Sequence, residues 1–408
     1  QERSGASRFY RSVYIKVGDP RTLGRGRSFS TTYSPSREML HLDTATVYHP
    51  NGTISRESAI ASFRQVSDVK ARMYYDLMEI TLSFPPLVPG DVVHIAYRVE
   101  SLPFGNKGLP FHGKIIQFQE FIPVNRSEVH IYHPKKYPFS SQITRKKGIF
   151  IKHDTYKHLQ HISYISGNLP GVAVEKAMPG WGETLLAVQT GPGVTWEEVG
   201  RRYGAFIKPQ YTPSRALSKI ARTITASART RTDKIAAIHR WVLKNFRYVA
   251  LMFGLHSYLP YTPEAILSRR FGDCKDMTLL MILLLKEVGI EAWPAAVRTR
   301  MLGKIPTLVP SLAPVDHSIV YLPRERRWLD TTTKEIIYPL LPPHIEGRPA
   351  LVISPRGGIL MNTSQSTSAQ NRELAKTTIT LKKSGDVRVT EKIMVQGAAE
   401  IGWAVQQG

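Results

Sequence analysis

Cysteine and long apolar runs are what this sequence has least of. Its 408 residues include one cysteine, Cys274, so no internal disulfide can form and the redox compartment stays open. The richest apolar run, MTLLMILLL at residues 277–285, is about half of the ~20 residues that span a bilayer, so it predicts a buried helix. The opening residues, QERSGASRFYRS, lack the apolar segment of a signal peptide. We therefore expect that a leader either never existed or has been removed.

Acidic residues are also scarce. The chain holds 32 Asp and Glu residues against 55 Lys and Arg residues, for a formal net charge of +23. Such a field attracts nucleic acid, acidic envelope polymers or acidic membrane surfaces. No zinc-finger, P-loop or RNA-recognition signature accompanies the charge, so we expect a solvated basic face rather than a dedicated nucleic-acid reader. The positive charge would also suit an anionic polymer of the cell envelope as a partner.

The first part of the chain has the pattern of strands and turns. Residues 41–54 predict a strand, a turn at Asn51-Gly52 and the start of another strand. Residues 91–99 show the β-branched and aromatic enrichment of a strand. Further strand patterns begin at Val129, Gly148 and His161. Because helical periods are scarce here, we predict an all-β sandwich domain over residues 1–188.

The middle of the chain mixes helical and strand patterns. Helices are predicted at residues 196–206 and 233–245, the second with one apolar face. Residues 272–289 are apolar almost all round, which predicts a helix at the centre of a core. Strand patterns follow at residues 292–299, 316–322 and 327–333. We therefore predict an α+β core domain over residues 195–355.

The end of the chain predicts a linker and a hairpin. Residues 362–371 are rich in Ser, Thr, Asn and Gln, as linkers are. Residues 376–395 have the pattern of a β-hairpin that turns at Ser384-Gly385. We expect residues 372–408 to be the start of a C-terminal β domain, and the chain to be part of a longer one.

The single cysteine occupies a position that favours chemistry. Asp273 can cap the predicted helix, with Asp276 in a capping-box position, so that Cys274 falls in the first turn. The free N–H groups and positive dipole end found there stabilise a thiolate and can donate to an oxyanion. The two aspartates oppose this effect, so a cationic neighbour is needed. The alternative is that Cys274 is a small buried hydrophobe.

His317 is the best candidate for that neighbour. It lies in the predicted strand of residues 316–322, and Asp330 lies in the next one, residues 327–333. In an antiparallel hairpin, a two-residue loop at 323–324 would put His317 opposite Asp330. A four-residue loop at 323–326 would leave them two positions out of register on one face, and a three-residue loop would separate their faces. Asp316 must point away from His317 on a regular strand.

Together these residues would form a nucleophile, a base and a carboxylate that orients the base. Cys274, His317 and Asp330 match the logic of Cys-His-Asp acyl transfer. The alternative is that Cys274 and His317 never meet.

Metal and cofactor chemistry is not indicated. His153, His158 and His161 cluster in the sequence, but on predicted strands and without a nearby set of carboxylate and cysteine ligands. We therefore predict no metal site and no cofactor.

At these residues the sequence resembles a known family. Residues 245–293, with the G-D-C-K-D block, resemble a bacterial transglutaminase-like core, and the D-H-S-I-V and W-L-D-T-T strands continue the likeness. The resemblance covers roughly residues 195–350. The N-terminal part resembles the β-sandwich domain of unknown function that commonly precedes this core in bacterial envelope proteins, through Ser67-Asp68 and the strand from Gly90.

The resemblance implies a papain-like α+β core and roles for its residues. It makes Cys274 the nucleophile, His317 the general base and acid, and Asp330 the orienting carboxylate. It also implies secretion, hence a periplasmic or envelope location, with the cytoplasm as the alternative.

Three further residues are candidates for the same site. Tyr248 is a candidate second oxyanion donor because a phenol can donate to an oxyanion, although a core aromatic residue is the alternative. His256 and Tyr258 are candidates for shaping the cleft.

We predict thiol-dependent acyl transfer on peptide or glutamine-type amides through a thioester. Water as the acceptor makes the protein a peptidase or amidase, and a lysine-like amine makes it a cross-linking enzyme; we favour hydrolysis because water is always present. The alternative is a non-catalytic envelope-binding or scaffold protein that uses its β domains and basic surface.

Overall fold

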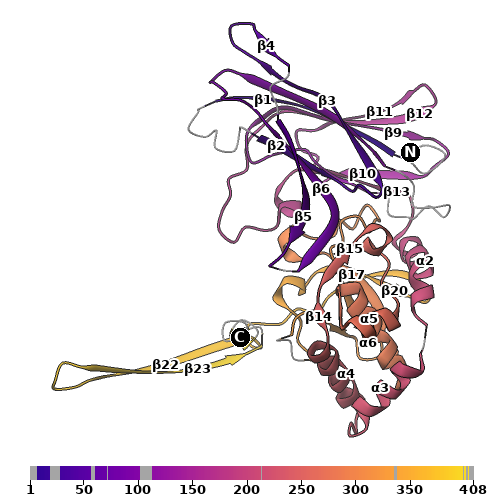
Figure 1. Cartoon of the computed structure of the whole chain (residues 1–408), viewed down its shortest axis with the longest axis vertical. Coiled ribbons are helices and arrows are strands. Elements are labelled where there is room, and N and C mark those ends of the chain that lie inside the picture. The colour runs from indigo at the N-terminus through magenta and orange to yellow at the C-terminus, as the bar shows by residue number, and fades with distance from the viewer. Residues whose placement is uncertain are drawn as a thin grey trace.

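The computed structural model describes residues 7–18, 28–56, 60–70, 72–101, 113–212, 214–334, 338–397, 399–400 and 403. A strand-rich part forms one end of an elongated molecule, a mixed helical and sheet core forms the other, and a hairpin projects to one side (Figure 1). This is the predicted multidomain order of a mostly β N-terminal region followed by an α+β core. The domain boundaries themselves stay a prediction.

The first strand-rich unit is a sandwich of two sheets. One sheet has the order β1-β7-β3-β4, and in the other β6 lies between β2 and β5. Apolar side chains from both sheets, including Val47, Leu82 and Ile95, form one buried cluster. The strands are β1 (Ser7–Lys16), β2 (Ser28–Tyr33), β3 (Glu38–Tyr48), β4 (Ile54–Ser55), β5 (Ile60–Asp68), β6 (Met73–Ser83) and β7 (Val92–Ser101).

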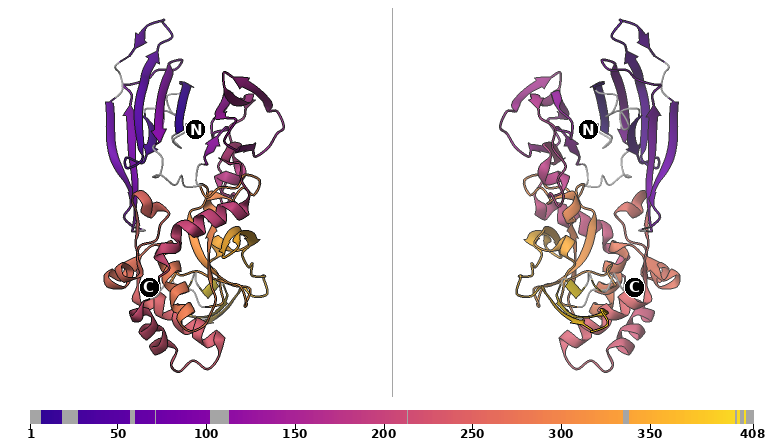
Figure 2. Two further views of the ribbon diagram at one scale, coloured as in Figure 1. Left: turned by 90° about the vertical axis from the view of Figure 1, so that its right-hand side faces the viewer. Right: turned by 90° about the vertical axis from the view of Figure 1, so that its left-hand side faces the viewer.

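A second unit with its own core follows, where the sequence predicted a single sandwich. Its sheets have the orders β11-β12-β9 and β10-β13-β8, and they bury a separate cluster that includes Phe118 and Val188. Figure 2 shows the two units as separate lobes on the core. The sequence could not separate the two units, because the alternation of apolar residues shows which face of a strand is buried but not which other sheet packs against that face. The elements are β8 (Ile115–Gln117), β9 (Val124–Pro134), β10 (Phe139–Ile143), β11 (Phe150–Tyr156), β12 (Leu159–Leu169), α1 (Trp181–Thr184) and β13 (Ala187–Pro192).

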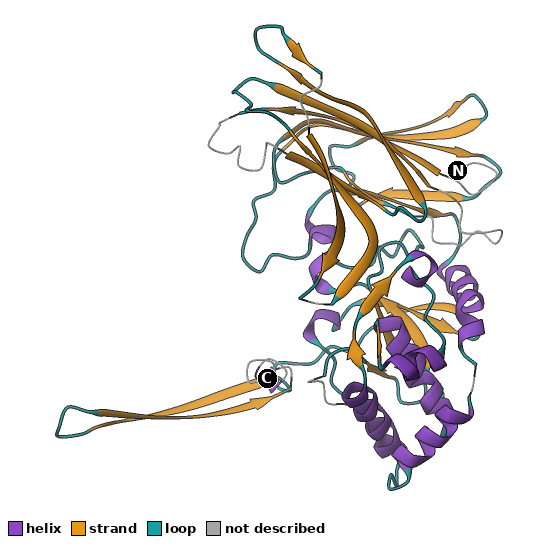
Figure 3. Cartoon of the chain, viewed as in Figure 1, coloured by secondary structure: helices purple, strands orange, loops and turns teal. Residues whose placement is uncertain are grey.

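The core packs helices against an antiparallel sheet of order β19-β18-β17-β20-β21 (Figure 3). Its strands are β17 (Trp293–Val297), β18 (His317–Leu322), β19 (Arg327–Leu329), β20 (Pro349–Ser354) and β21 (Gly357–Asn362). Its helices are α2 (Trp196–Ile207), α3 (Arg215–Thr225), α4 (Arg231–Asn245), α5 (Pro263–Arg269) and α6 (Cys274–Glu287). The sequence predicted α2, α4 and α6 but missed α3 and α5. Short pieces complete the core: β14 (Arg247–Tyr248), β15 (Ala250–Met252), β16 (Phe271–Gly272), and the 3-10 turns η3 (Lys208–Gln210), η4 (Gly254–Ser257), η5 (Arg300–Leu302) and η6 (Pro343–Ile345).

Helix α6 is the centre of the core, as its composition predicted. Asp273 caps it: the carboxylate accepts from the Lys275 and Asp276 amides, while the Asp276 carboxylate accepts from the Asp273 amide. Every residue from Cys274 to Leu285 is buried. Gly289 follows the helix with a φ of 74°, a conformation that favours glycine. The sequence therefore fixes both ends of the helix that carries the cysteine.

The predicted hairpin is present. It consists of β22 (Arg372–Leu381) and β23 (Val387–Gln396), paired antiparallel. Every residue of β22 is exposed, and the hairpin extends away from the core (Figure 1). None of the described helices is long and apolar enough to cross a membrane.

Candidate active site

Cys274 is the first residue of α6 and is 6% exposed. The capping interactions of Asp273 fix the helix start, so the thiol is held at the end of the helix where free N–H groups gather. The local sequence thus determines where the sulfur lies.

Two loop lengths would put His317 and Asp330 on one face of the hairpin, and the structure has the longer one. Strands β18 and β19 pair Leu322 with Arg327, so the loop is the four-residue one at 323–326. Asp330 lies just past the end of β19, where its Oδ2 is 2.6 Å from His317 Nε2. Both residues are buried, His317 at 8% exposure and Asp330 at 0%.

Asp330 is held in place by several donors. Its Oδ1 accepts from the Thr332 amide (2.8 Å), the Thr332 hydroxyl (2.8 Å) and the Thr333 amide (3.1 Å). Burial alone would raise the pKa of Asp330, but the His317 charge and these hydrogen bonds hold it well below its usual range. Asp330 is therefore a fixed, ionised acceptor.

The surroundings of His317 favour its charged form. Burial lowers its pKa, but the Asp330 charge, the hydrogen bond to Asp330 and the Cys274 side chain together raise it well above 6.5. The structure thus sets His317 and Asp330 in a line beside the start of α6, where the Ser318 hydroxyl of β18 donates to Thr278 Oγ1 of α6 at 3.3 Å. The catalytic roles of Cys274, His317 and Asp330 belong to the proposal below.

Asp316 lies outside that line, as strand alternation predicted. Its carboxylate accepts from the Thr299 amide (2.7 Å) and the Thr299 hydroxyl (2.5 Å). It therefore cannot replace Asp330 as the partner of His317.

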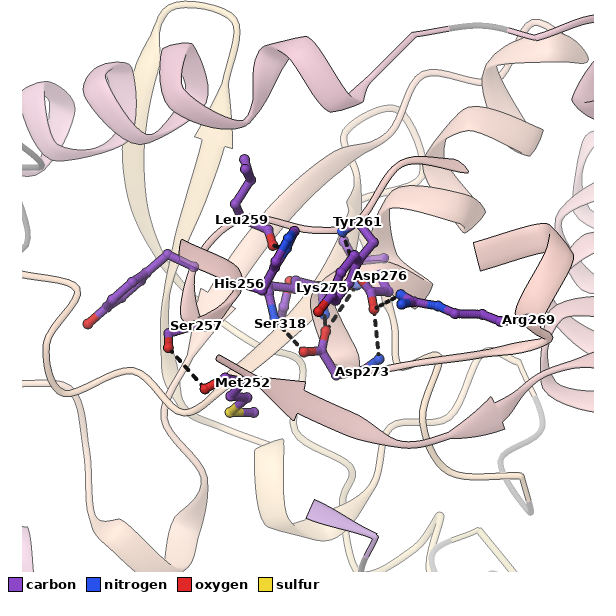
Figure 4. Close-up of polar contacts among 12 residues, drawn as sticks. Met252, His256, Ser257, Leu259, Tyr261, Arg269, Asp273, Lys275, Asp276 and Ser318 are labelled. Carbon is purple, nitrogen blue, oxygen red and sulfur yellow. Dashed lines mark hydrogen bonds and ion pairs between the residues drawn. The ribbon is translucent and has the colours of Figure 1, made fainter. Parts of the chain in front are cut away.

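Each of the two aspartates that flank Cys274 has a cationic partner of its own. Lys275 pairs with Asp273, and Arg269 Nη2 lies 3.2 Å from Asp276 Oδ2 (Figure 4). Burial and the Asp273 charge nevertheless raise the pKa of Asp276. These ion pairs reduce the negative field that the aspartates would exert on the neighbouring sulfur.

Tyr248 lies beside residues 271–273, which lead into Cys274 and are called the nucleophile loop here because that cysteine is the predicted nucleophile. Strand β14 pairs parallel with β16 and sets Tyr248 against Gly272, two residues before the cysteine. Burial raises the pKa of Tyr248, and the Cys274 and Asp273 charges raise it further, so the phenol keeps its proton. A protonated phenol near Cys274 suits an oxyanion donor, and this role stays a prediction.

His256 and Tyr258 lie in different surroundings. His256 is near the first turn of α6, and Tyr258 packs into the core. The His256 ring stacks on Tyr261, with centroids 3.6 Å apart, and its Nδ1 is 2.9 Å from the Leu259 carbonyl oxygen (Figure 4). Tyr258 packs against the apolar cluster between α2 and the sheet. Their described contacts are structural, and their predicted role in a cleft stays a prediction.

Two further histidines at the site were not predicted. His239 of α4 is buried, and its Nε2 lies 2.6 Å from the Asp330 carbonyl oxygen. His344 of η6 has its ring 6.1 Å from that of His317. His239 falls on the apolar stripe of its helix, which could have marked it as buried, whereas no signal distinguishes His344.

His153 and His161, which lie close together in the sequence, do not share a site in the structure. His161 pairs with His130 instead, while ladder alternation puts His153 on the other face of the sheet from His161. Within the described ranges, no group of three or more His, Cys, Asp or Glu residues is arranged to hold a metal ion.

Two family models match the chain. A domain of unknown function with a solved structure, DUF3857, matches residues 3–161, and the transglutaminase-like superfamily matches residues 218–304. The second match contains Cys274 and ends before His317.

Solved structures give a likeness of fold. A candidate protease from Parabacteroides distasonis is similar at a TM-score of 0.69 and 14% identity, over 89% of this chain and 69% of that one. A candidate cysteine protease from Cytophaga hutchinsonii has a TM-score of 0.26 at 14% identity, over 69% of this chain and 89% of that one, which is too low to support an argument. No curated protein matches the chain.

Proposed function

On the premise that the chain carries a transglutaminase-like domain, we propose that it is a thiol-dependent peptidase or amidase that acts through Cys274, His317 and Asp330. The observation that carries the proposal is the buried pair of His317 and Asp330, 2.6 Å apart, on a strand that is hydrogen-bonded to the first turns of the helix that Cys274 begins. An ion pair of thiolate and imidazolium is the resting state that such a nucleophile needs.

The reaction begins with attack of the Cys274 thiolate on the amide carbonyl carbon. The oxyanion that forms accepts from the Cys274 backbone N–H and the Tyr248 phenol. His317 then protonates the amine as the C–N bond breaks, which leaves a thioester on the sulfur. Asp330 holds the ring in position and stabilises its charge.

Hydrolysis completes the cycle. Neutral His317 takes a proton from water, hydroxide adds to the thioester, and the C–S bond breaks to release the carboxylic acid and restore the ion pair. An amine in place of water would give a cross-link, and we propose water as the principal acceptor because it is always present. A location in the cell envelope stays a prediction.

The test is turnover of a protein substrate. Wild-type protein should release peptides with new amino termini from denatured casein, and Cys274→Ala should lower that rate at least about 100-fold while keeping its melting temperature. Adding a fluorescent primary amine separates the two acceptors, because cross-linking would incorporate it into casein with release of ammonia. Equal casein turnover by wild type and Cys274→Ala would contradict the proposal and favour the scaffold alternative.

A further inference from the structure

The segment 247–252 joins the nucleophile loop to the N-terminal sandwich. Its first part, β14, pairs parallel with β16, and the Val249 amide donates to the Gly272 carbonyl oxygen at 3.0 Å. Its second part, β15, pairs parallel with the start of β6. The Ala250 amide donates to the Arg72 carbonyl oxygen at 3.0 Å. This six-residue segment is thus hydrogen-bonded to the loop before Cys274 through β14 and to β6 of the N-terminal sandwich through β15.

A second attachment lies just beyond β15. The Asp76 carboxylate of β6 accepts from the Ser34 hydroxyl at 2.7 Å and from the Ser36 hydroxyl. Ser36 lies against the turn after β15, because a side chain on Gly254 would come within 3.9 Å of Ser36 Oγ. Asp76 therefore holds a serine of the N-terminal sandwich against that turn.

We propose that the N-terminal sandwich completes the active site: β6, through its pairing with β15, holds the segment that carries Tyr248 against the nucleophile loop, and Asp76 supports the turn that follows. The pairings of β14 and β15 span two and three residues, too short to be stable without neighbours. This gives the domain of unknown function a role as a brace. The inference rests on the proposed function of the core.

The test compares variants of β6 in the full chain. Asp76→Ala removes the attachment, and Asp76→Asn, which keeps one acceptor oxygen, serves if the first variant does not fold. Glu79→Ala is the matched control, because Glu79 lies on the same strand and pairs with the exposed Arg64 at 2.7 Å. The measurements are amide hydrogen exchange over residues 247–257 and casein turnover.

Asp76→Ala should speed exchange in this segment at least about tenfold and slow casein turnover by about the same factor, while Glu79→Ala changes neither. Unchanged exchange in the Asp76 variants, or faster exchange with wild-type turnover, would overturn the brace.

If wild-type protein shows no Cys274-dependent turnover, the proposed function fails, and the exchange measurement still decides the brace.

Discussion

Two histidine–aspartate pairs in this molecule have the same length and different surroundings. His317 Nε2 lies 2.6 Å from Asp330 Oδ2 in the core, and His161 Nδ1 lies 2.6 Å from Asp154 Oδ1 in the second strand-rich unit. The Asp330 side chain is 0% exposed, whereas that of Asp154 is 33% exposed. Contact distance alone therefore does not distinguish the candidate site from a surface pair.

The third partner makes the difference. The strand of His317 is hydrogen-bonded to the helix that Cys274 begins, whereas His161 contacts the His130 ring, whose Nδ1 is 3.1 Å from His161 Nε2. Asp154 also pairs with the exposed Lys152 at 2.8 Å. The core pair lies near the only cysteine of the chain, whereas the surface pair belongs to a partly exposed network of histidine, carboxylate and lysine side chains.

Replacing each histidine by asparagine should give the largest difference between the two pairs, measured as the loss of casein turnover. His317→Asn removes the group that protonates the leaving amine, so casein turnover should fall by about 10²- to 10⁴-fold. His161→Asn should leave turnover within about twofold of wild type. Steady-state kinetics of both variants measure this, with circular dichroism as the check on folding. Comparable losses in the two variants would remove the distinction.

The stability of the two pairs should depend differently on salt and pH. Because truncating one partner of a buried pair leaves a charge uncompensated, His317→Asn should lower the free energy of unfolding by roughly 3 kcal/mol, with little response to salt. Any loss in His161→Asn should shrink at high salt, because exposed charges are screened. Urea titrations at low and high salt measure both effects.

The pH window follows from the two pKa shifts. The raised pKa of His317 contributes stability below 6.5 that is lost as pH rises through the folded-state pKa. The lowered pKa of Asp330 contributes stability above 3.8 that is lost as pH falls through its folded-state pKa. The advantage of wild type over His317→Asn should therefore be largest between these values. A difference that stays constant as the pH falls below 3.8 or rises from 6.5 through the folded-state pKa of His317 would contradict the ion pair.

The smallest expected effect concerns His239, which supports only the core pair. His239→Leu leaves the buried Asp330 carbonyl without its donor, so kcat should fall about tenfold with KM little changed. His239→Gln keeps an N–H donor at the end of the side chain and should restore kcat to within about threefold of wild type. If Gln and Leu lower kcat equally, His239 does not position Asp330.

The site was predictable where it depends on local sequence. The Asp273 cap fixed Cys274 at the start of α6, and strand parity set His317 and Asp330 on one face, although it left the loop length open. The pairing of β15 with β6 was not predictable, because both strands are short or irregular locally and lie far apart in the sequence. The same holds for His344, which sits in a loop where no periodicity applies.

Alkylation of Cys274 by iodoacetamide, mapped by mass spectrometry from about pH 5 to about pH 9, tests the central claim most directly. A thiolate paired with the His317 imidazolium should react near pH 6 faster than the thiol of glutathione, and His317→Asn should lose that advantage. Reaction that rises only as the pH approaches ~8.5, where an ordinary cysteine ionises, would show that the imidazole does not activate this sulfur.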